Sequence, residues 1–305
     1  MIVDSLQRLG AAGFPISDYQ YTGFGSIYFI DFILFHKLLG LNRLLSLERQ
    51  ESLTKRVIFN RPFSCVDIKM VPASSEIPNL SRDVRHILWL DYDGVMHRDF
   101  LSHIQSAVTV LPAGSILLVT VDVEPPEGYD YKGAEPDFDD SKEVLGPKQW
   151  KRYFEYHASG YLKLGLSEDD FGKSKLVLRS TDILRAAFTK AIVARRDLQF
   201  LPMFNFVYKD SHSMLTMGGM IAGRAEKRQL RASNMDEAVY YRDDFDAPPF
   251  EIRLPRLTRK ERIYLDREMP CADGWAPKDF DLDIEETQRY RDLYRFLPAF
   301  AEILL

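Results

Sequence analysis

The chain has 305 residues, of which 46% are hydrophobic and 28% charged, and its formal net charge is -5 at pH 7. This composition is typical of a folded globular protein and excludes a disordered one. The net negative charge does not indicate nucleic-acid binding, which depends on clustered Lys and Arg, although a local basic patch is still allowed. Cys65 and Cys271 are the only cysteines, which excludes a disulfide framework and a Cys-rich zinc site.

Targeting and membrane signals are also missing from the sequence. The first residues lack the basic segment and apolar run of a signal peptide, and no apolar stretch has the length of a membrane span. We therefore expect a protein of the reducing cytoplasm with no membrane partner.

The first 122 residues alternate strand-like and helix-like segments at the spacing of a parallel sheet with crossover helices. The predicted elements are a strand over 18–23, an apolar helix over 26–39, a strand over 43–47, a helix over 50–60, strands over 66–71 and 86–91, a helix over 98–111 and a strand over 114–121. The helix over 26–39 is apolar on nearly every side. We therefore expect it to lie between the sheet and a second helix formed by residues 2–9.

The regular alternation stops after Asp122. Residues 123–180 are rich in Pro, Gly, Asp and aromatic side chains, which predicts an inserted lid that shapes access to a substrate. A helix over 181–196, which Ser180 or Thr181 can cap, and a hairpin with strands over 200–208 and 213–221 follow.

We expect a main domain over residues 1–222 and a C-terminal extension over 223–305, with helices at 258–269 and 285–304. These two helices are a candidate surface for a second copy of the chain or for the other subunits of a complex.

A glycine loop and an acidic residue mark a candidate nucleotide site. The segment Tyr-Thr-Gly-Phe-Gly-Ser, residues 21–26, ends the first predicted strand, and Glu48 ends the second. Glycines at a strand-to-helix turn let the backbone approach a ligand, and a carboxylate at the second strand end can accept hydrogen bonds from ribose hydroxyls. A tight turn that only closes the strand against the helix is the structural alternative, because a Gly-x-Gly pair alone is a weak signal.

Acidic residues also stand at the ends of two further predicted strands. Asp91, Tyr92 and Asp93 follow one strand, and Asp122 ends the next. A carboxylate at this edge could act as a general base or orient a nucleophile, and the structural alternative is a helix cap with a solvated neighbour. Two carboxylates on neighbouring strands could also hold Mg²⁺. Because oxygen ligands are few here, we favour a solvated loop acid at Asp122 and predict no metal site.

The order of elements resembles that of the class I S-adenosylmethionine-dependent methyltransferases over residues 18–122 and 181–222. More narrowly, Gly-Phe-Gly-Ser, Ser-Leu-Glu and Trp-Leu-Asp-Tyr-Asp-Gly look like the motifs of a group of bacterial O-methyltransferases. The resemblance implies an α/β fold, a Rossmann-like three-layer sandwich whose mostly parallel seven-stranded sheet ends in an antiparallel hairpin. It also implies an enzyme that transfers a methyl group from S-adenosylmethionine to an oxygen or nitrogen nucleophile of an unidentified acceptor.

The same resemblance assigns roles to residues by their position in the motifs. The loop beneath the methionine part of the cofactor would consist of Thr22, Gly23, Phe24, Gly25 and Ser26. Glu48 would hold the ribose, Ser74 and Ser75 would lie beside the adenine, and Asp91 would face both cofactor and acceptor. The catalytic candidates are Asp91, Tyr92 and Asp93.

Two departures from the family pattern leave other functions open. Ser26 and Ile27 stand where a third glycine is usual, and Tyr92 and Asp93 replace the prolines of amino-methylating DNA enzymes. Methylation of DNA adenine or cytosine N4 is therefore disfavoured. One alternative is a non-catalytic methyltransferase-like subunit that senses a nucleotide or acts as a scaffold in a bacterial defence or mobile-element system. The other is an NAD-binding oxidoreductase, against which the late hairpin argues.

Overall fold

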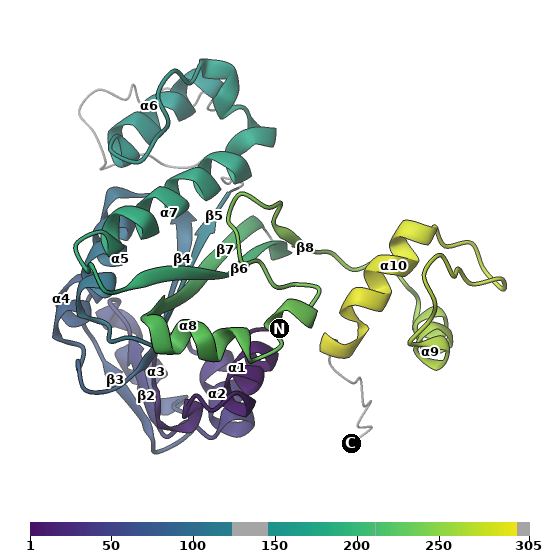
Figure 1. Ribbon diagram of the computed structural model, residues 1–305, viewed down its shortest axis with the longest axis horizontal. Helices are drawn as coiled ribbons and strands as arrows, with labels where there is room; N and C mark the ends of the chain where they lie inside the picture. The colour runs from purple at the N-terminus through teal and green to yellow at the C-terminus, as the bar shows by residue number, and fades with distance from the viewer. Residues whose placement is uncertain (124–145, 211, 298–305) are drawn as a thin grey trace. The chain divides into compact units, whose positions relative to one another are not determined.

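The computed structural model describes residues 1–123, 146–210 and 212–297 (Figure 1). The chain forms two compact units, of which the larger is Ile2–Phe250 and the smaller begins at Glu251. We expected the C-terminal extension to begin at residue 223. Residues 224–250 instead belong to the larger unit, where Leu230, Tyr240 and Phe245 are buried.

The described residues form one sheet of eight strands, and the first seven lie entirely within the larger unit. These strands are β1 (Gln20–Phe24), β2 (Arg43–Leu47), β3 (Val66–Lys69), β4 (His86–Val95), β5 (Ile116–Asp122), β6 (Gln199–Asp210), β7 (His212–Ala222) and β8 (Phe250–Ile252). Their order is β3-β2-β1-β4-β5-β7-β6-β8. Strands β1 to β5 are parallel, whereas β7 is antiparallel to both β5 and β6. The predicted Rossmann-like sheet with its late hairpin is confirmed, and β8 is an eighth strand that we did not predict.

Helices cover the sheet on both faces, which gives three layers. They are α1 (Ile2–Ala11), α2 (Ile30–Leu39), α3 (Thr54–Phe59), α4 (Ala73–Glu76), α5 (Arg98–Val110), α6 (Pro147–Ala158), α7 (Leu176–Ile192) and α8 (Arg224–Arg231). On one face α5 packs against α7, and buried residues of both helices share a core with β4 and β5. On the other face α1 packs against α2 (Figure 1).

The helix after the first strand is shorter than predicted. It begins at Ile30 rather than at residue 26 because Phe29 has a left-handed backbone, with φ 49°, and it ends at Gly40, which is the usual left-handed C-terminal cap with φ 72°. The expected contact with the first helix is present. However, Ile30, Leu34 and Leu38 are 64%, 43% and 51% exposed, so one side of α2 is not covered.

Two other boundaries differ from the prediction. Strand β4 continues past Asp91 to Val95, which still pairs with Asp122 of β5 after a shift in register. Helix α7 begins at Leu176, and Ser180 and Thr181 are buried inside it, so neither residue caps the helix.

The lid that we predicted over residues 123–180 lies partly outside the described residues, at 124–145. Its described part includes α6, whose Trp150 and Phe154 are buried in the core of the larger unit. Whether this part acts as a lid stays a prediction.

The smaller unit contains the helices α9 (Arg259–Glu268) and α10 (Ile284–Leu293). Thr258 caps α9 by accepting a hydrogen bond from the Glu261 amide at 3.3 Å, and Tyr290 of α10 donates to Asp266 of α9 at 2.5 Å. The second helix is shorter than the predicted 285–304, and residues 298–305 lie outside the described part. In the described chain, no helix combines the length and apolar character needed to cross a membrane.

Candidate functional site

The parallel register brings three strands together at the predicted site. Gly23 of β1 lies between Ser46 of β2 and Trp89 of β4. Paired residues of parallel strands point to the same face, and side chains alternate along each strand. Tyr21, Gly23, Ser46 and Asp91 therefore belong to the face that α2 covers, whereas Phe24 and Tyr92 belong to the face that α5 covers.

A partly buried hydrogen bond links β1 to α2 on the first of these faces. The Tyr21 hydroxyl donates to the Asp31 carboxylate, and the Tyr21 ring packs edge-on against Phe32 and Phe35, with centroids 4.8 and 4.6 Å away. Burial raises the pKa of the Asp31 carboxyl, and burial followed by the charges of Asp31 and Asp91 raises the pKa of Tyr21 well above its usual value. Tyr21 therefore stays a protonated donor at this site.

Sequence reasoning did not assign a role to this tyrosine. The signal that could have found it is spacing, because Tyr21 stands two residues before Gly23 and so shares its face.

Both glycines of the motif have close neighbours. A Cβ on Gly23 would overlap the Tyr21 hydroxyl and lie 3.3 Å from Asp31 Oδ2. A Cβ on Gly25 would lie 3.0 Å from both Ser46 Oγ and Glu48 Cβ. Close packing therefore disfavours a larger residue at either position. The loop backbone at Gly25 lies directly against the end of β2.

Two polar side chains beside Gly25 have unused hydrogen-bonding capacity. Glu48 is half-buried, and its Oε1 accepts from the Gln50 amide at 2.8 Å, while no described residue bonds to Oε2. The Ser46 hydroxyl is fully buried and has no partner among the described residues. The Glu48 Oε2 atom, next to the glycine loop, can accept a hydrogen bond from the ribose of a nucleotide, because ribose hydroxyls are donors.

Tyr92 lies on the opposite face of β4 from Asp91. Its ring stacks on Phe100 with centroids 3.6 Å apart, and its hydroxyl lies 2.7 Å from His103 Nδ1. Burial raises the pKa of Tyr92 well above its usual value and lowers the pKa of His103, so the tyrosine donates to a neutral imidazole. Asp91 and Asp93 are exposed.

The other predicted cofactor residues differ in exposure. Thr22 is fully buried in β1, whereas Ser26 is exposed and its Oγ accepts from the Tyr28 amide at 3.1 Å. Ser74 and Ser75 are exposed on α4, where Ser75 donates to a backbone carbonyl of its own turn at 2.8 Å. Among the predicted site residues, Gly25 thus lies against Glu48, and Phe24 packs on Tyr92 with ring centroids 5.0 Å apart.

Asp122 is 2% exposed at the end of β5, so the structure does not place it as a solvated loop acid. Within the described ranges, no three His, Cys, Asp or Glu side chains are grouped closely enough to hold a metal ion.

His97, just after β4, and His157 of α6 form a pair that was not predicted from the sequence. The two residues are 60 positions apart and meet only because α6 packs near the end of β4. The rings of His97 and His157 have centroids 4.2 Å apart, and His157 is 4% exposed, with no described partner for Nδ1. Burial, with smaller contributions from His97 and Arg98, lowers the pKa of His157 to about 4. Arg98 also donates to the Tyr156 hydroxyl, so two contacts hold α6 beside the end of β4.

Comparisons with solved structures give only distant likenesses. The cofactor-bound protein Rv0187 from MTB is 13% identical, with 72% of this chain and 80% of that chain covered and a TM-score of 0.38. Trm1 from Pyrococcus horikoshii, solved with S-adenosyl-L-methionine, is 14% identical over 77% of this chain and 57% of its own, with a TM-score of 0.41. A methyltransferase-like protein from Listeria monocytogenes is 8% identical over 72% and 99%, with a TM-score of 0.36.

No curated protein matches the chain. The protein family described as "Putative O-methyltransferase" matches residues 1–305. Because this match covers the whole length, the chain belongs to that family of methyltransferases.

Proposed function

We propose that this chain transfers a methyl group from S-adenosylmethionine to an oxygen or nitrogen nucleophile on an acceptor that is still to be identified. The observation that carries the proposal is the half-buried Glu48 carboxylate next to Gly25, where Oε2 has no partner among the described residues. A carboxylate in this position accepts hydrogen bonds from two neighbouring hydroxyls, and charge-assisted bonds of this kind are the stronger ones.

The cofactor would lie across the carboxyl ends of β1, β2 and β4. The backbone of residues 22–26 would support its methionine part, Glu48 would hold the ribose, and Ser74 or Ser75 would lie beside the adenine. The sulfonium of S-adenosylmethionine supplies a methyl group that is already activated for attack. Placement of the nucleophile therefore matters more than strong acid or base chemistry by the protein.

The acceptor would meet the carboxylates of β4. Asp91 and Asp93 are both exposed near the end of β4, so either can orient a nucleophile or take its proton. Tyr92 points to the face opposite Asp91 and is bound to His103. In this proposal Tyr92 holds the strand in position and does not touch the acceptor.

Isothermal titration calorimetry with S-adenosylmethionine and with S-adenosylhomocysteine tests the cofactor assignment. Glu48→Ala should weaken binding by about 1–3 kcal/mol, because charge-assisted hydrogen bonds to the ribose are lost. Glu51→Ala is the matched control, since Glu51 is exposed three residues further on, and it should bind as the wild type does. An absence of binding heat with both ligands would refute the proposal.

A second candidate is a methyltransferase-like subunit that binds a nucleotide without transferring a methyl group. The packing role of both glycines favours it, because Gly23 and Gly25 are then explained without catalysis. S-adenosylmethionine carrying a labelled methyl group distinguishes the two candidates. Label transfer to any fraction of a cell extract supports the enzyme, whereas binding without transfer supports the subunit.

A further inference from the structure

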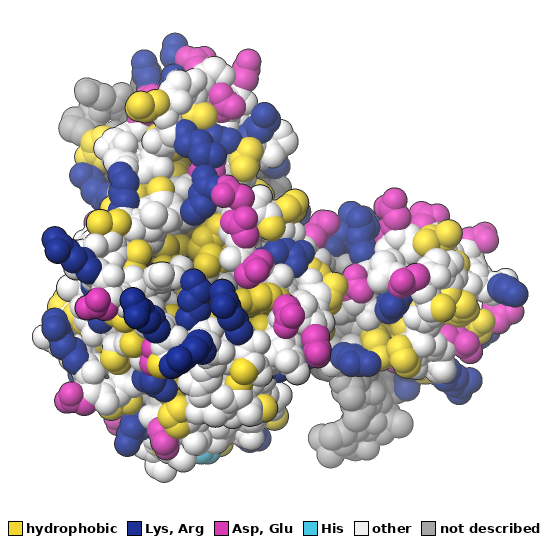
Figure 2. Space-filling model, viewed as in Figure 1, with side chains coloured by type: hydrophobic (Ala, Val, Ile, Leu, Met, Phe, Trp, Pro, Cys, Tyr) yellow, Lys and Arg dark blue, Asp and Glu magenta, His cyan; other side chains and the backbone are white. Residues whose placement is uncertain are grey.

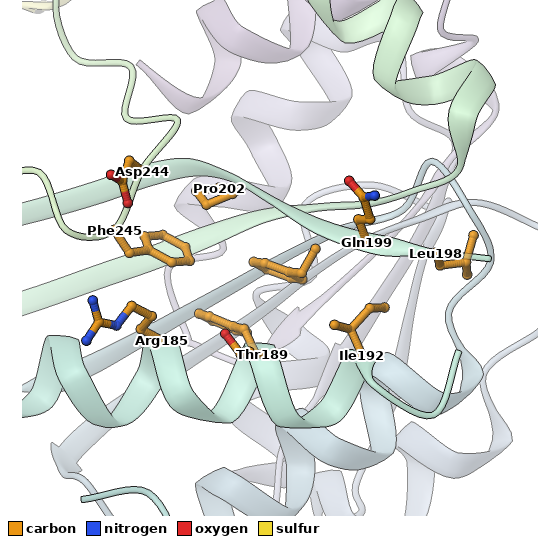
Figure 3. Close-up of a pocket in the computed structure, with 10 residues that line it drawn as sticks. Arg185, Thr189, Ile192, Leu198, Gln199, Pro202, Asp244 and Phe245 are labelled. Atoms are coloured by element: carbon orange, nitrogen blue, oxygen red, sulfur yellow. The ribbon is translucent and has the colours of Figure 1, made fainter. Parts of the chain in front are cut away.

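A cavity of about 340 Å³ opens on the larger unit between α7, the start of β6 and the loop that follows Tyr241 (Figure 3). Helix α7 contributes one wall through Arg185, Thr189 and Ile192, and the loop contributes Asp244 and Phe245. This volume is at the lower end of the range for small-molecule sites.

The cavity is separate from the proposed methyl-transfer site. Gln199 of β6 pairs with Ala222 of β7, and the nearby Met220 pairs with Ile116 at the start of β5. The cavity therefore lies toward the amino ends of the parallel strands, whereas the candidate site lies at their carboxyl ends.

Aromatic rings form the floor of the cavity. Phe188 and Phe200 are stacked, with centroids 4.3 Å apart and planes within 4°, and Phe245 lies 5.7 Å from Phe188. Phe188 and Phe245 are buried, but Phe200 and Leu198 are half-exposed. A flat apolar surface is thus open to solvent, which favours a planar apolar ligand.

One cation does not line the cavity itself but contacts a residue that does, and it has no anionic partner among the described residues. Lys227 of α8 donates to Gln199 Oε1 at 3.0 Å, and it pairs with no carboxylate of the described residues. At the other end of the cavity, Arg185 is already paired with Asp182 at 3.1 Å and with Asp246. Figure 2 shows hydrophobic side chains in this hollow and Lys and Arg side chains over α8 beside it.

We propose that this cavity binds a small planar aromatic carboxylate. The ring system would lie on Phe200 and the neighbouring aliphatic side chains, and the carboxylate would take the place of Gln199 as the partner of Lys227. A carboxylate would form an ion pair with the Lys227 ammonium, and an aromatic ring would cover the exposed face of Phe200. The site therefore favours a ligand that has an anionic group at one end and an apolar ring system at the other.

The test uses the full chain with 2-naphthoate and its neutral amide, 2-naphthamide, in titration calorimetry. Methyl NMR of Ile192 and Leu198 locates the bound ligand. Naphthoate should bind more tightly than the amide, and Lys227→Gln should weaken naphthoate about fivefold while leaving the amide unchanged. Arg231→Gln on the same helix is the matched control and should have no effect, since Arg231, unlike Lys227, makes no hydrogen bond to a described residue that lines the cavity.

A second variant, which fills the cavity, tests the location of the site independently of the charge of Lys227. Thr189 is exposed on α7, so Thr189→Trp can fill the cavity without disturbing the core, and it should abolish binding of both probes. The proposal is overturned if naphthoate does not bind, if Lys227→Gln has no effect, or if the methyl shifts fall elsewhere. Binding of S-adenosylhomocysteine should be unchanged in both variants, which separates this test from that of the proposed function.

Discussion

Replacing His157 with Phe should remove an acid-sensitive contribution to the stability of the fold. The imidazole is 4% exposed and lies among aromatic rings, with Tyr153 at 4.3 Å and His97 at 4.2 Å. A phenyl ring is similar in shape and needs no hydrogen-bond partner. Because Nδ1 has no partner among the described residues, the substitution should change the free energy of unfolding by no more than about 1 kcal/mol at pH 8.

The sign and size of the pH effect follow from the pKa of His157. Burial lowers it from 6.5 to about 4, so the folded protein favours the neutral ring while the unfolded chain binds a proton near pH 6.5. The contribution of His157 is complete above pH 6.5 and is lost as the pH falls from there to about 4. Each pKa unit corresponds to about 1.4 kcal/mol, so the wild type should lose about 2 kcal/mol between pH 8 and pH 5 through this residue.

Urea denaturation of the wild type and of His157→Phe at pH 8, 6.5 and 5 measures this effect. The difference between their free energies of unfolding should shift by about 2 kcal/mol in favour of the variant as the pH falls. His157→Gln serves as the control, because it cannot titrate and should show the same shift from a lower starting stability. An unchanged difference across the three pH values would refute the assignment of a buried neutral histidine.

Two other changes, with one control, test the candidate site by urea denaturation. Gly23→Ala should cost about 1–3 kcal/mol, because its methyl group would displace the Tyr21 hydroxyl from Asp31. Gly10→Ala is the matched control, since the nearest atom to its added methyl is 3.9 Å away, and it should be neutral or stabilise the helix by up to about 1 kcal/mol. Tyr21→Phe should cost about 1–3 kcal/mol at pH 7 by leaving a buried carboxylate without its donor. Burial raises the pKa of Asp31, so the folded protein favours the protonated carboxyl. The loss of unfolding free energy caused by Tyr21→Phe should therefore become smaller as the pH falls toward 4, and a loss that becomes larger would contradict this reasoning.

Several parts of the fold could be predicted from the sequence because they depend on residues that are close together in the chain. The second strand was predicted at 43–47 and observed at Arg43–Leu47, because this apolar run is too short for a typical helix and follows the helix-ending Gly40. The alternation of strands and helices likewise predicted the parallel sheet and the late hairpin. Boundaries were less accurate where a distant strand extends the pairing, as at Val95.

The candidate site was predictable only as a set of positions. The motif placed Gly25 and Glu48 at neighbouring strand ends, and the structure brings them together. It could not show that Tyr92 would bind His103, because that contact depends on how α5 packs on the sheet. Spacing places Tyr21 on the face of Gly23, but the motif could not show that Tyr21 donates to Asp31, since that partner is supplied by the next helix.

The sequence by itself determined the alternation of strands and helices along the chain and the positions of the glycine loop and the acidic strand ends, because each depends on residues close together in the chain. Only the tertiary structure decided which side chains are free to meet a ligand. Glu48 keeps one carboxylate oxygen without a described partner, while Tyr21 and Tyr92 are both engaged by residues ten or eleven positions away. The histidine pair and the cavity beside α7 likewise arise from contacts between distant segments, which local patterns do not encode.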